Sequence, residues 1–508
     1  MKQLFLLLSS FIALSVHAQD TIGIFPFNKD IGSPKMKGSA TYDGVAQAYT
    51  LKGGGYDVWY NRDEFRYLWK KMTYDFIVTA NFELTGKEGN AQSKVGWMVR
   101  KEGDPASAHI STALHGDGLT VLQWRPEAGA NMLVPQDERF FSKRNVQVMQ
   151  LERRGDVFIM RAAGYGEPLQ IVGYHEMKNM AGEVLVGLFV CAHDSNAIAE
   201  ARVSNVRICD PVPMNNNPNP NRAWRVGSRL ETIDIFNGKR KIVYQSVGRL
   251  ESPNWMPGGK KILFNADGLL FTVPVAGGST AEVLNTGLAK RINGAHCISS
   301  DGKMLGIGNS DGRWPNILLL PLSGGTPETV VNEMPAYLHG LSPDNKAVVF
   351  TAPRKDMPGA VYDIYKKSVN GGQAVRLTDS KRYEFADGCE YSPDGKYIYY
   401  NASQRGGTMQ IWRMRPDGSG KEQLTFGAYN NWFPHISPDG KWMAFISFPP
   451  ETRPNVHPAY ASVTIRLMPV SGGAARVIAY LYGGQGSLDE NSWSPDSRHL
   501  SFVSYTTL

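Results

Sequence analysis

Apolar and polar residues alternate with a period of two through the first two hundred residues. Clear runs cover 76–84 and 145–151. In the first run, one face carries Phe76, Val78, Ala80, Phe82 and Leu84. Alternation of this kind is typical of strands with one buried face. Turn residues at 115–118 and 154–156 separate the runs, so the pattern predicts an antiparallel β-sandwich over 19–209.

A repeated turn motif replaces this alternation in the second half of the chain. Ser-Pro-Asp stands at 342–344, 392–394, 437–439 and 494–496, with a weaker Ser-Ser-Asp at 299–301 and a decayed copy at 256–259. The Asp positions from 301 to 496 recur every 43 to 57 residues. A Gly-containing turn follows each of the first five copies, and a sixth such turn stands at 237–238, before the first copy. Each copy precedes a short apolar run, which suits a buried strand after a tight turn.

Six markers of each kind predict a six-bladed β-propeller over 225–508. The last unit lacks its two outer strands, and apolar segments at 230–236 and 241–246 can supply them. We therefore expect both ends of this region to pair and close the ring. The Pro- and Asn-rich stretch 210–224 has no hydrophobic period and is expected to be a linker, which makes the fold class all-β.

The N-terminal residues have the pattern of an export signal. Lys2 precedes a short apolar run, and Val16-His17-Ala18 forms a small-residue cleavage site. Residues 1–18 are thus predicted to be a bacterial-type signal peptide, with no lipoprotein cysteine after it, on a periplasmic or secreted protein. No other stretch is long and apolar enough to predict a transmembrane segment.

Composition narrows the classes of function. Hydrophobic residues make up 42% of the 508 positions, which excludes a mostly disordered chain. The net charge of +7 is spread without a basic run, so no nucleic-acid partner is predicted. The four cysteines form no C-x-x-C pair, and we expect buried free thiols.

Several segments resemble known families. Segments 94–125 and 186–208 resemble concanavalin-like, laminin-G-like sandwich domains, which commonly bind glycans. SPDGKYIYYNAS (392–403) and ISPDGKWMAFISF (436–448) resemble the WD-like repeats of TolB-type propellers. That broad family includes the Tol-system protein, propellers attached to peptidases and the related propeller of oligogalacturonate lyases.

Polar residues on the inner strands are the first candidates for chemistry, because the first strand of each blade lines the propeller axis. Four consecutive blades supply His296, His339, Glu390 and His435. Imidazole and carboxylate groups suit acid–base catalysis or a borderline divalent metal. The alternative is that each histidine is a hydrogen-bonded structural residue.

The lyase resemblance implies a divalent metal held by His and Gln side chains. On that analogy His296, His339 and His435 are the candidate metal ligands, and Gln485 could be the amide. If the protein cleaves its ligand, we expect His435 and Glu390 to be catalytic and Arg382 to clamp an acidic sugar.

Loops near the same mouth of the propeller supply candidate substrate-binding residues. Besides Gln485, these are Asp387, Asn431, Trp432 and Glu490. Aromatic, amide and carboxylate groups together suit a sugar. Packing between blades is the alternative role for Trp432.

Two hypotheses of different class follow. In the first, the protein is an exported glycan-handling protein: the sandwich binds carbohydrate, and the propeller binds or cleaves an oligosaccharide. In the second, the propeller is a non-enzymatic scaffold for a protein partner in the cell envelope. The residues leave open whether the protein is an enzyme.

Overall fold

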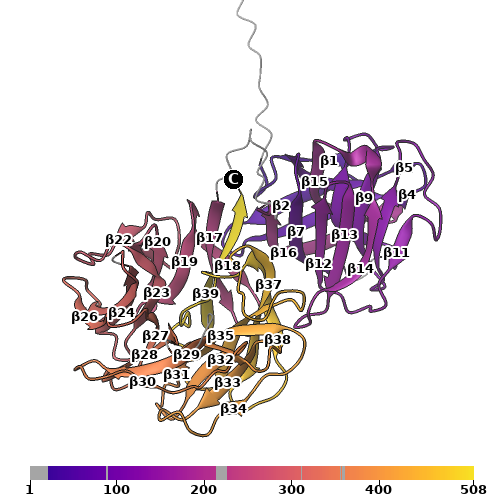
Figure 1. Cartoon of the computed structure of the whole chain (residues 1–508). Coiled ribbons are helices and arrows are strands. Elements are labelled where there is room, and N and C mark those ends of the chain that lie inside the picture. The colour runs from indigo at the N-terminus through magenta and orange to yellow at the C-terminus, as the bar shows by residue number, and fades with distance from the viewer. Residues whose placement is uncertain are drawn as a thin grey trace, which may run out of the picture.

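The protein folds into two β-rich lobes, seen here in a computed structural model (Figure 1). The structure describes residues 21–86, 90–212, 226–310, 312–354, 356 and 361–507. The predicted signal peptide and residues 213–224 of the predicted linker lie outside these ranges. Within them, the secondary structure is almost entirely strand, with one short 3-10 turn, η1 (Lys178–Met180). No helix in the described ranges is long and apolar enough to cross a membrane.

The N-terminal lobe is a sandwich of two seven-stranded antiparallel sheets. In spatial order, the first sheet contains β1 (Phe27–Ile31), β6 (Phe65–Met72), β15 (Val184–Cys191), β8 (Lys94–Arg100), β9 (His109–His115), β10 (Thr120–Arg125) and β11 (Glu138–Phe140). The second contains β14 (Gln170–Glu176), β13 (Val157–Ala163), β12 (Val148–Arg154), β7 (Phe76–Leu84), β16 (Asp194–Cys209), β3 (Ala48–Gly55) and β2 (Ser39–Asp43). A two-stranded ribbon, β4 (Val58–Trp59) with β5 (Arg62–Asp63), lies outside both sheets.

The period-two pattern of β7 decides which of its residues face the core between the two sheets. Phe76, Val78, Ala80 and Phe82 all lie in the core between the two sheets, as the alternation predicts. Burial of such side chains stabilises by about 25 cal/mol per Å² of apolar surface removed from water. The sandwich is thus held by the residues that the sequence pattern selects.

The C-terminal lobe is a six-bladed propeller, as predicted. Five blades are four-stranded antiparallel sheets. Their strands, blade by blade, are β19 (Leu250–Trp255), β20 (Lys261–Ala266), β21 (Leu269–Pro274), β22 (Glu282–Val283); β23 (Ile292–Ile298), β24 (Met304–Ser310), β25 (Pro315–Pro321), β26 (Glu328–Val331); β27 (Tyr337–Leu341), β28 (Ala347–Pro353), β29 (Tyr362–Ser368), β30 (Val375–Arg376); β31 (Phe385–Tyr391), β32 (Ile398–Ser403), β33 (Gln410–Met414), β34 (Glu422–Gln423); β35 (Asn430–Ile436), β36 (Trp442–Phe448), β37 (Ala461–Pro469), β38 (Arg476–Gly483).

The sixth blade joins the two ends of the propeller region. β39 (His499–Thr507) pairs with β17 (Val226–Asp234), which pairs with β18 (Arg240–Val247) (Figure 1). At the position of the innermost strand, this blade has only a single antiparallel β-bridge between Trp493 and Leu500. The early segments therefore supply the outer strands of the last blade, as the sequence predicts.

The repeated Ser-x-Asp turn is held by its own side chains. In the copy at 437–440, Ser437 Oγ donates to Asp439 Oδ1 at 2.6 Å and accepts from the Trp442 N–H at 2.9 Å. Gly440 follows with a φ of +72°, a left-handed conformation that glycine adopts without strain. These local bonds explain why the motif recurs at the end of each inner strand.

Each of the five inner strands contains a register shift, and most of the shifts include a left-handed residue. Ser252, Gly294, Gly388 and Phe433 have φ values of +53°, +88°, +59° and +54°. Such bulges bend a strand and change where the following side chains point. They therefore decide which inner-strand residues reach the propeller axis.

The sandwich docks on the sixth blade through buried polar contacts. Glu231 of β17 accepts hydrogen bonds from Arg207 of the sandwich (Nε, 3.0 Å), Arg240 (Nη2, 2.8 Å) and Ser504 (Oγ, 2.6 Å). We call these four residues the interface cluster. A second link joins the Gln47 amide to both backbone groups of Ile242, at 2.9 and 3.1 Å.

All four cysteines are buried free thiols, as predicted. Cys191 and Cys209 lie in the sandwich strands β15 and β16. Burial raises the pKa of both thiols to about 12, so they remain protonated and unreactive at neutral pH.

Candidate functional site

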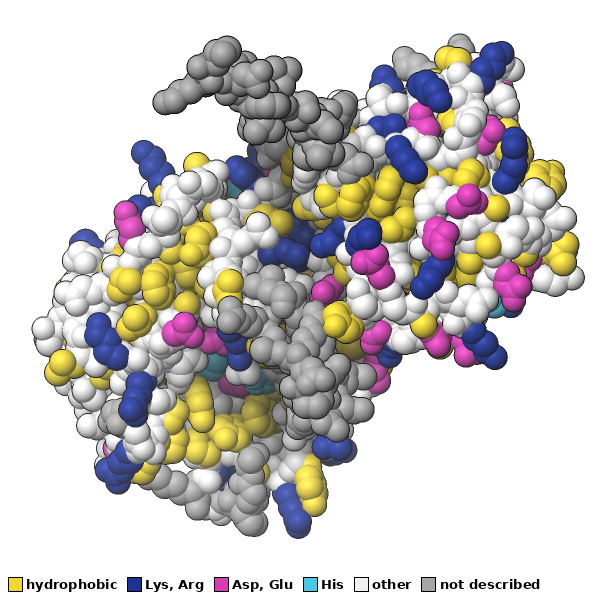
Figure 2. Space-filling model, turned by 90° about the horizontal axis from the view of Figure 1, so that it is seen from above, with side chains coloured by type: hydrophobic (Ala, Val, Ile, Leu, Met, Phe, Trp, Pro, Cys, Tyr) yellow, Lys and Arg dark blue, Asp and Glu magenta, His cyan; other side chains and the backbone are white. Residues whose placement is uncertain are grey.

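A cavity of about 370 Å³ opens at the end of the propeller where the inner strands begin. Figure 2 shows histidine and acidic side chains in this part of the lobe, beside hydrophobic ones. The residues lining it come from β23, β27, β28, β29, β31 and β35 and from two loops, and they are Asn293, Gly294, Ala295, Tyr337, His339, Thr351, Tyr362, Phe385, Asp387, Phe433, Asn455, His457, Gln485, Asp489 and Glu490. Its volume lies at the lower end of the range for small-molecule sites.

Aromatic rings form one side of the cavity. The Tyr337 and Tyr362 ring centroids lie 6.3 Å apart, and those of Tyr362 and Phe385 lie 5.1 Å apart. Behind them, Phe385 packs on the buried Trp432 at 5.8 Å. The wall therefore presents ring surface that is fixed by neighbouring rings, which suits stacking with little loss of side-chain entropy.

A histidine–aspartate pair stands beside this wall. His339 Nε2 lies 2.9 Å from Asp387 Oδ1, and the two residues come from neighbouring inner strands, β27 and β31. Burial by itself would raise the pKa of Asp387, but its hydrogen bond to His339, the nearby His339 and His457 rings and the Thr351 hydroxyl together outweigh that effect and lower the pKa. Asp387 is therefore a carboxylate at neutral pH and holds the His339 ring in one orientation.

His457 reaches the cavity from the long loop within its blade. Its ring lies 4.4 Å from the Trp432 ring and 5.3 Å from the Phe433 ring, measured between centroids. Burial lowers its pKa, so the imidazole is neutral at pH 7. Its Nδ1 has no hydrogen-bond partner among the described residues and is available to a ligand.

Two adjacent carboxyl groups complete the polar side. Asp489 Oδ2 accepts a hydrogen bond from the Gly486 N–H at 2.8 Å, and burial raises the Asp489 pKa to about 7. Glu490 is only 1% exposed, and burial together with the Asp489 charge raises its pKa well above the ordinary value. Asp489 Oδ1 and Glu490 Oε2 find no hydrogen-bond partner among the described residues. These oxygens are free to bond a ligand.

The structure brings together four of the residues predicted from sequence. His339, Asp387, Gln485 and Glu490 all line the cavity. Arg382 does not; its guanidinium stacks over the exposed Tyr383 ring at 4.9 Å.

Glu390 and His435 meet each other but lie outside the cavity lining. His435 Nδ1 is 2.6 Å from Glu390 Oε2, and its Nε2 is 3.0 Å from the Leu488 carbonyl. The other Glu390 oxygen accepts from the Asn491 amide at 2.6 Å. This set joins neighbouring blades, which is the structural role considered for such histidines.

Three other predicted residues are engaged in packing or in local hydrogen bonds. His296 Nδ1 bonds the Gly294 carbonyl at 2.9 Å, and burial lowers its pKa to about 4. Asn431 donates to Gln410 Oε1 at 3.0 Å, and Trp432 is fully buried. In the described ranges, no three His, Cys, Asp or Glu side chains are grouped so that they could hold a metal ion. The three predicted metal ligands, His296, His339 and His435, instead form hydrogen bonds with different partners.

The aromatic wall was missed by the sequence reasoning. Tyr337 and Phe385 stand two positions before His339 and Asp387 on the same inner strands, so the period of two could have pointed to them. Tyr362 comes from β29, outside the inner strands, and no sequence pattern places it there.

Comparison with known proteins identifies relatives of the propeller. A family model for the TolB beta propeller domain matches residues 297–507. An uncharacterized protein of Agrobacterium fabrum is 40% identical over 283 residues, which cover 55% of this chain and 94% of the relative.

One solved structure supports the same relationship, and a second, more distant one is also similar. A TolB candidate from Agrobacterium tumefaciens is 38% identical with a TM-score of 0.52, covering 56% of this chain and 100% of its own. TolB from Acinetobacter baumannii is 18% identical with a TM-score of 0.40, and the match covers 66% of this chain and 80% of that protein.

Proposed function

This chain belongs to the TolB-like β-propeller family, and from this we propose that it is a binding protein whose axial cavity takes one unit of a carbohydrate. The observation that carries the proposal is the two-sided cavity: Tyr337, Tyr362 and Phe385 on one side, and carboxyl groups on the other. A sugar ring offers a C–H face for stacking and hydroxyl groups for hydrogen bonding, so it complements both sides.

The charge of the cavity narrows the class of sugar. Among the described lining residues are Asp387, which is ionised, and Asp489 and Glu490, whose pKa values are raised, but no Lys or Arg. The ionised Asp387 would repel the carboxylate of a uronic acid, and no cation of a described lining residue would pair with that carboxylate, whereas a neutral or amine-bearing sugar meets neither cost. The proposed ligand therefore differs from the acidic sugar that Arg382 suggested in the sequence.

Binding measurements by calorimetry test this proposal. The probes are neutral, amine-bearing and uronic oligosaccharides, and the variants are Tyr362→Ala and Glu490→Gln. We expect Tyr362→Ala to weaken binding about tenfold, equivalent to about 1.4 kcal/mol. The matched control is Phe426→Ala, which removes a ring that is 76% exposed and outside the cavity.

Three outcomes discriminate between the hypotheses. Binding of neutral or amine-bearing sugars that is lost in Tyr362→Ala supports the proposal. Binding that survives both cavity variants would assign it to the sandwich, for which we also propose a carbohydrate-binding role. Absence of binding to every probe would refute the glycan proposal and favour a protein partner.

We further propose that the protein is exported and acts in the periplasm or outside the cell. The support is the segment 1–18, with Lys2 and the apolar run before Ala18. N-terminal sequencing of the protein from an expressing bacterium is expected to start at Gln19. A mature chain that still begins at Met1 would refute export by this route.

A further inference from the structure

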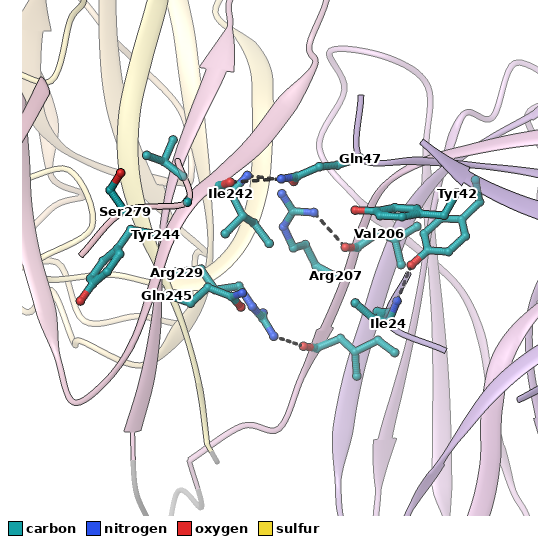
Figure 3. A pocket seen from close by; sticks show the side chains of 14 residues that line it. Ile24, Tyr42, Gln47, Val206, Arg207, Arg229, Ile242, Tyr244, Gln245 and Ser279 are labelled. Atoms are coloured by element: carbon teal, nitrogen blue, oxygen red, sulfur yellow. Dashed lines mark hydrogen bonds between the residues drawn. The ribbon is translucent and has the colours of Figure 1, made fainter. Parts of the chain in front are cut away.

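A second cavity, of about 380 Å³, lies where the sandwich meets the sixth blade. Figure 2 shows basic side chains gathered in the hollow between the two lobes, and Figure 3 shows the cavity from close by. The sandwich supplies Tyr42 and Arg207, and the propeller supplies Arg229, Tyr244 and Gln245. Both domains therefore contribute polar and aromatic groups to one space.

Hydrogen bonds fix the walls of this cavity. The Gln47 side chain bonds both backbone groups of Ile242, joining the two lobes across the cavity (Figure 3). On the sandwich side, the Ile24 N–H donates to the Tyr49 hydroxyl at 2.9 Å, and the Tyr42 and Tyr49 rings pack at 4.7 Å. The space is thus held open in a defined shape, which favours binding because little ordering is needed.

The charge around this cavity is not balanced. Arg207 and Arg240 share the single carboxylate of Glu231. Arg229 lines the cavity and donates to the Ile208 carbonyl at 2.9 Å; no carboxylate of a described residue forms an ion pair with it. Asp210 attracts it from further away. Three guanidinium groups against two carboxylates leave this region positive.

Burial makes that excess costly. Arg229 is half-buried, and its desolvation and the nearby Arg207 charge lower the pKa of its guanidinium, against opposing effects that include Glu231 and Asp210. A charge that is partly removed from water is unfavourable unless an opposite charge meets it. An anion in the cavity would supply the missing partner, and a guanidinium is well suited to bind carboxylate or phosphate oxygens.

We propose that this cavity between the domains is a binding site for a small anionic ligand, with Arg229 meeting its carboxylate or phosphate group. The Tyr42 and Tyr244 rings flank the space and suit a ring-bearing ligand such as an acidic sugar or a sugar phosphate. The site is separate from the axial cavity, and its sign of charge is opposite. This proposal therefore does not depend on the function proposed above, and a test of one does not decide the other.

Calorimetry at constant ionic strength tests the anion site, with glucuronate, glucose 6-phosphate and uncharged glucose as probes. We expect at least one anion to bind and glucose not to bind at this site. Arg229→Met is expected to weaken anion binding at least tenfold. Arg415→Met, which removes an exposed charge on a different blade, is the matched control and should leave the affinity unchanged.

A second variant guards against misfolding of the first. Gln245 is exposed at the rim of the cavity, so Gln245→Glu adds a repelling charge without disturbing buried groups. It should also weaken anion binding. Binding of glucuronate alone would identify a carboxylate ligand, and binding of glucose 6-phosphate alone a phosphate ligand. The proposal is overturned if neither anion binds more tightly than about 1 mM, or if Arg229→Met and Gln245→Glu bind as the wild type does.

Discussion

Replacing Glu231 by Gln removes the one negative charge of the interface cluster. The Glu231 side chain is fully buried and accepts hydrogen bonds from Arg207, Arg240 and Ser504. Gln keeps the shape and one acceptor oxygen but leaves two buried guanidinium groups without a counter-charge. Breaking a buried ion pair costs about 3–5 kcal/mol. We expect the lower end, about 3 kcal/mol, because the amide oxygen retains one hydrogen bond.

Urea and thermal unfolding measure this loss. At about 2–4 °C per kcal/mol for a domain of this size, the melting temperature should fall by about 6–12 °C. The matched control is Glu282→Gln, whose ion pair with Lys261 is exposed to solvent and whose loss should change the melting temperature little. A loss in Glu231→Gln no larger than in this control would refute the reasoning.

The pH dependence of the same variant gives a further check. Burial alone would raise the pKa of Glu231, but Arg207 and Arg240 outweigh it and hold the pKa far below its ordinary value. The stabilisation from this group is therefore complete above the ordinary Glu pKa and declines only as the pH falls below it. The difference between wild type and Glu231→Gln should stay constant above about pH 5 and narrow on acidification.

Three further predictions concern the propeller. Ser437→Ala removes the hydroxyl that bonds Asp439 and should cost about 1–2 kcal/mol in urea unfolding; a cost near zero would mean that water replaces these bonds. Gly388→Ala would place a Cβ 2.4 Å from Asn401 Oδ1 at a φ of +59° and should cost about 3 kcal/mol, against about 1 kcal/mol for the open Gly406→Ala; equal losses would contradict the steric argument. Asp489 has a folded pKa near 7, raised from 3.8, so its charge destabilises the fold increasingly as the pH rises from 4 to 7. Asp489→Asn should therefore gain stability above pH 7, by at most about 4 kcal/mol, and none below pH 4; a gain independent of pH would refute this assignment.

The propeller could be predicted from sequence because its repeat is local. Ser437, Asp439 and Gly440 form their turn with bonds among near neighbours, so the motif is visible in the chain itself. The closing blade was also predictable, because two apolar segments had no other place in a ring of six. Strand alternation was enough to predict which β7 residues lie in the core between the two sheets.

The site was only partly predictable because the inner strands are bulged. In β31 the register shifts between Asp387 and Glu390, so Asp387 lines the cavity while Glu390 faces His435 between blades. A prediction from regular in–out alternation along a strand cannot anticipate this register shift. The cavity also lies further from the repeated turns than His435 does, toward the start of each inner strand. The proposed anion site is lined by Arg207 of the sandwich and Arg229 of the propeller, and no local pattern shows that these residues lie together.

The sixth blade also sets an order for the assembly of the molecule. The sandwich docks on β17 and β18, and β17 completes its sheet only with β39. One member of the docking surface, Ser504, lies 273 residues after Glu231 in the chain. During synthesis the sandwich can fold early, but it has no finished surface to bind until that late strand arrives. The sandwich can therefore dock only after the propeller ring has closed. A truncation before β39 is expected to leave the two lobes undocked.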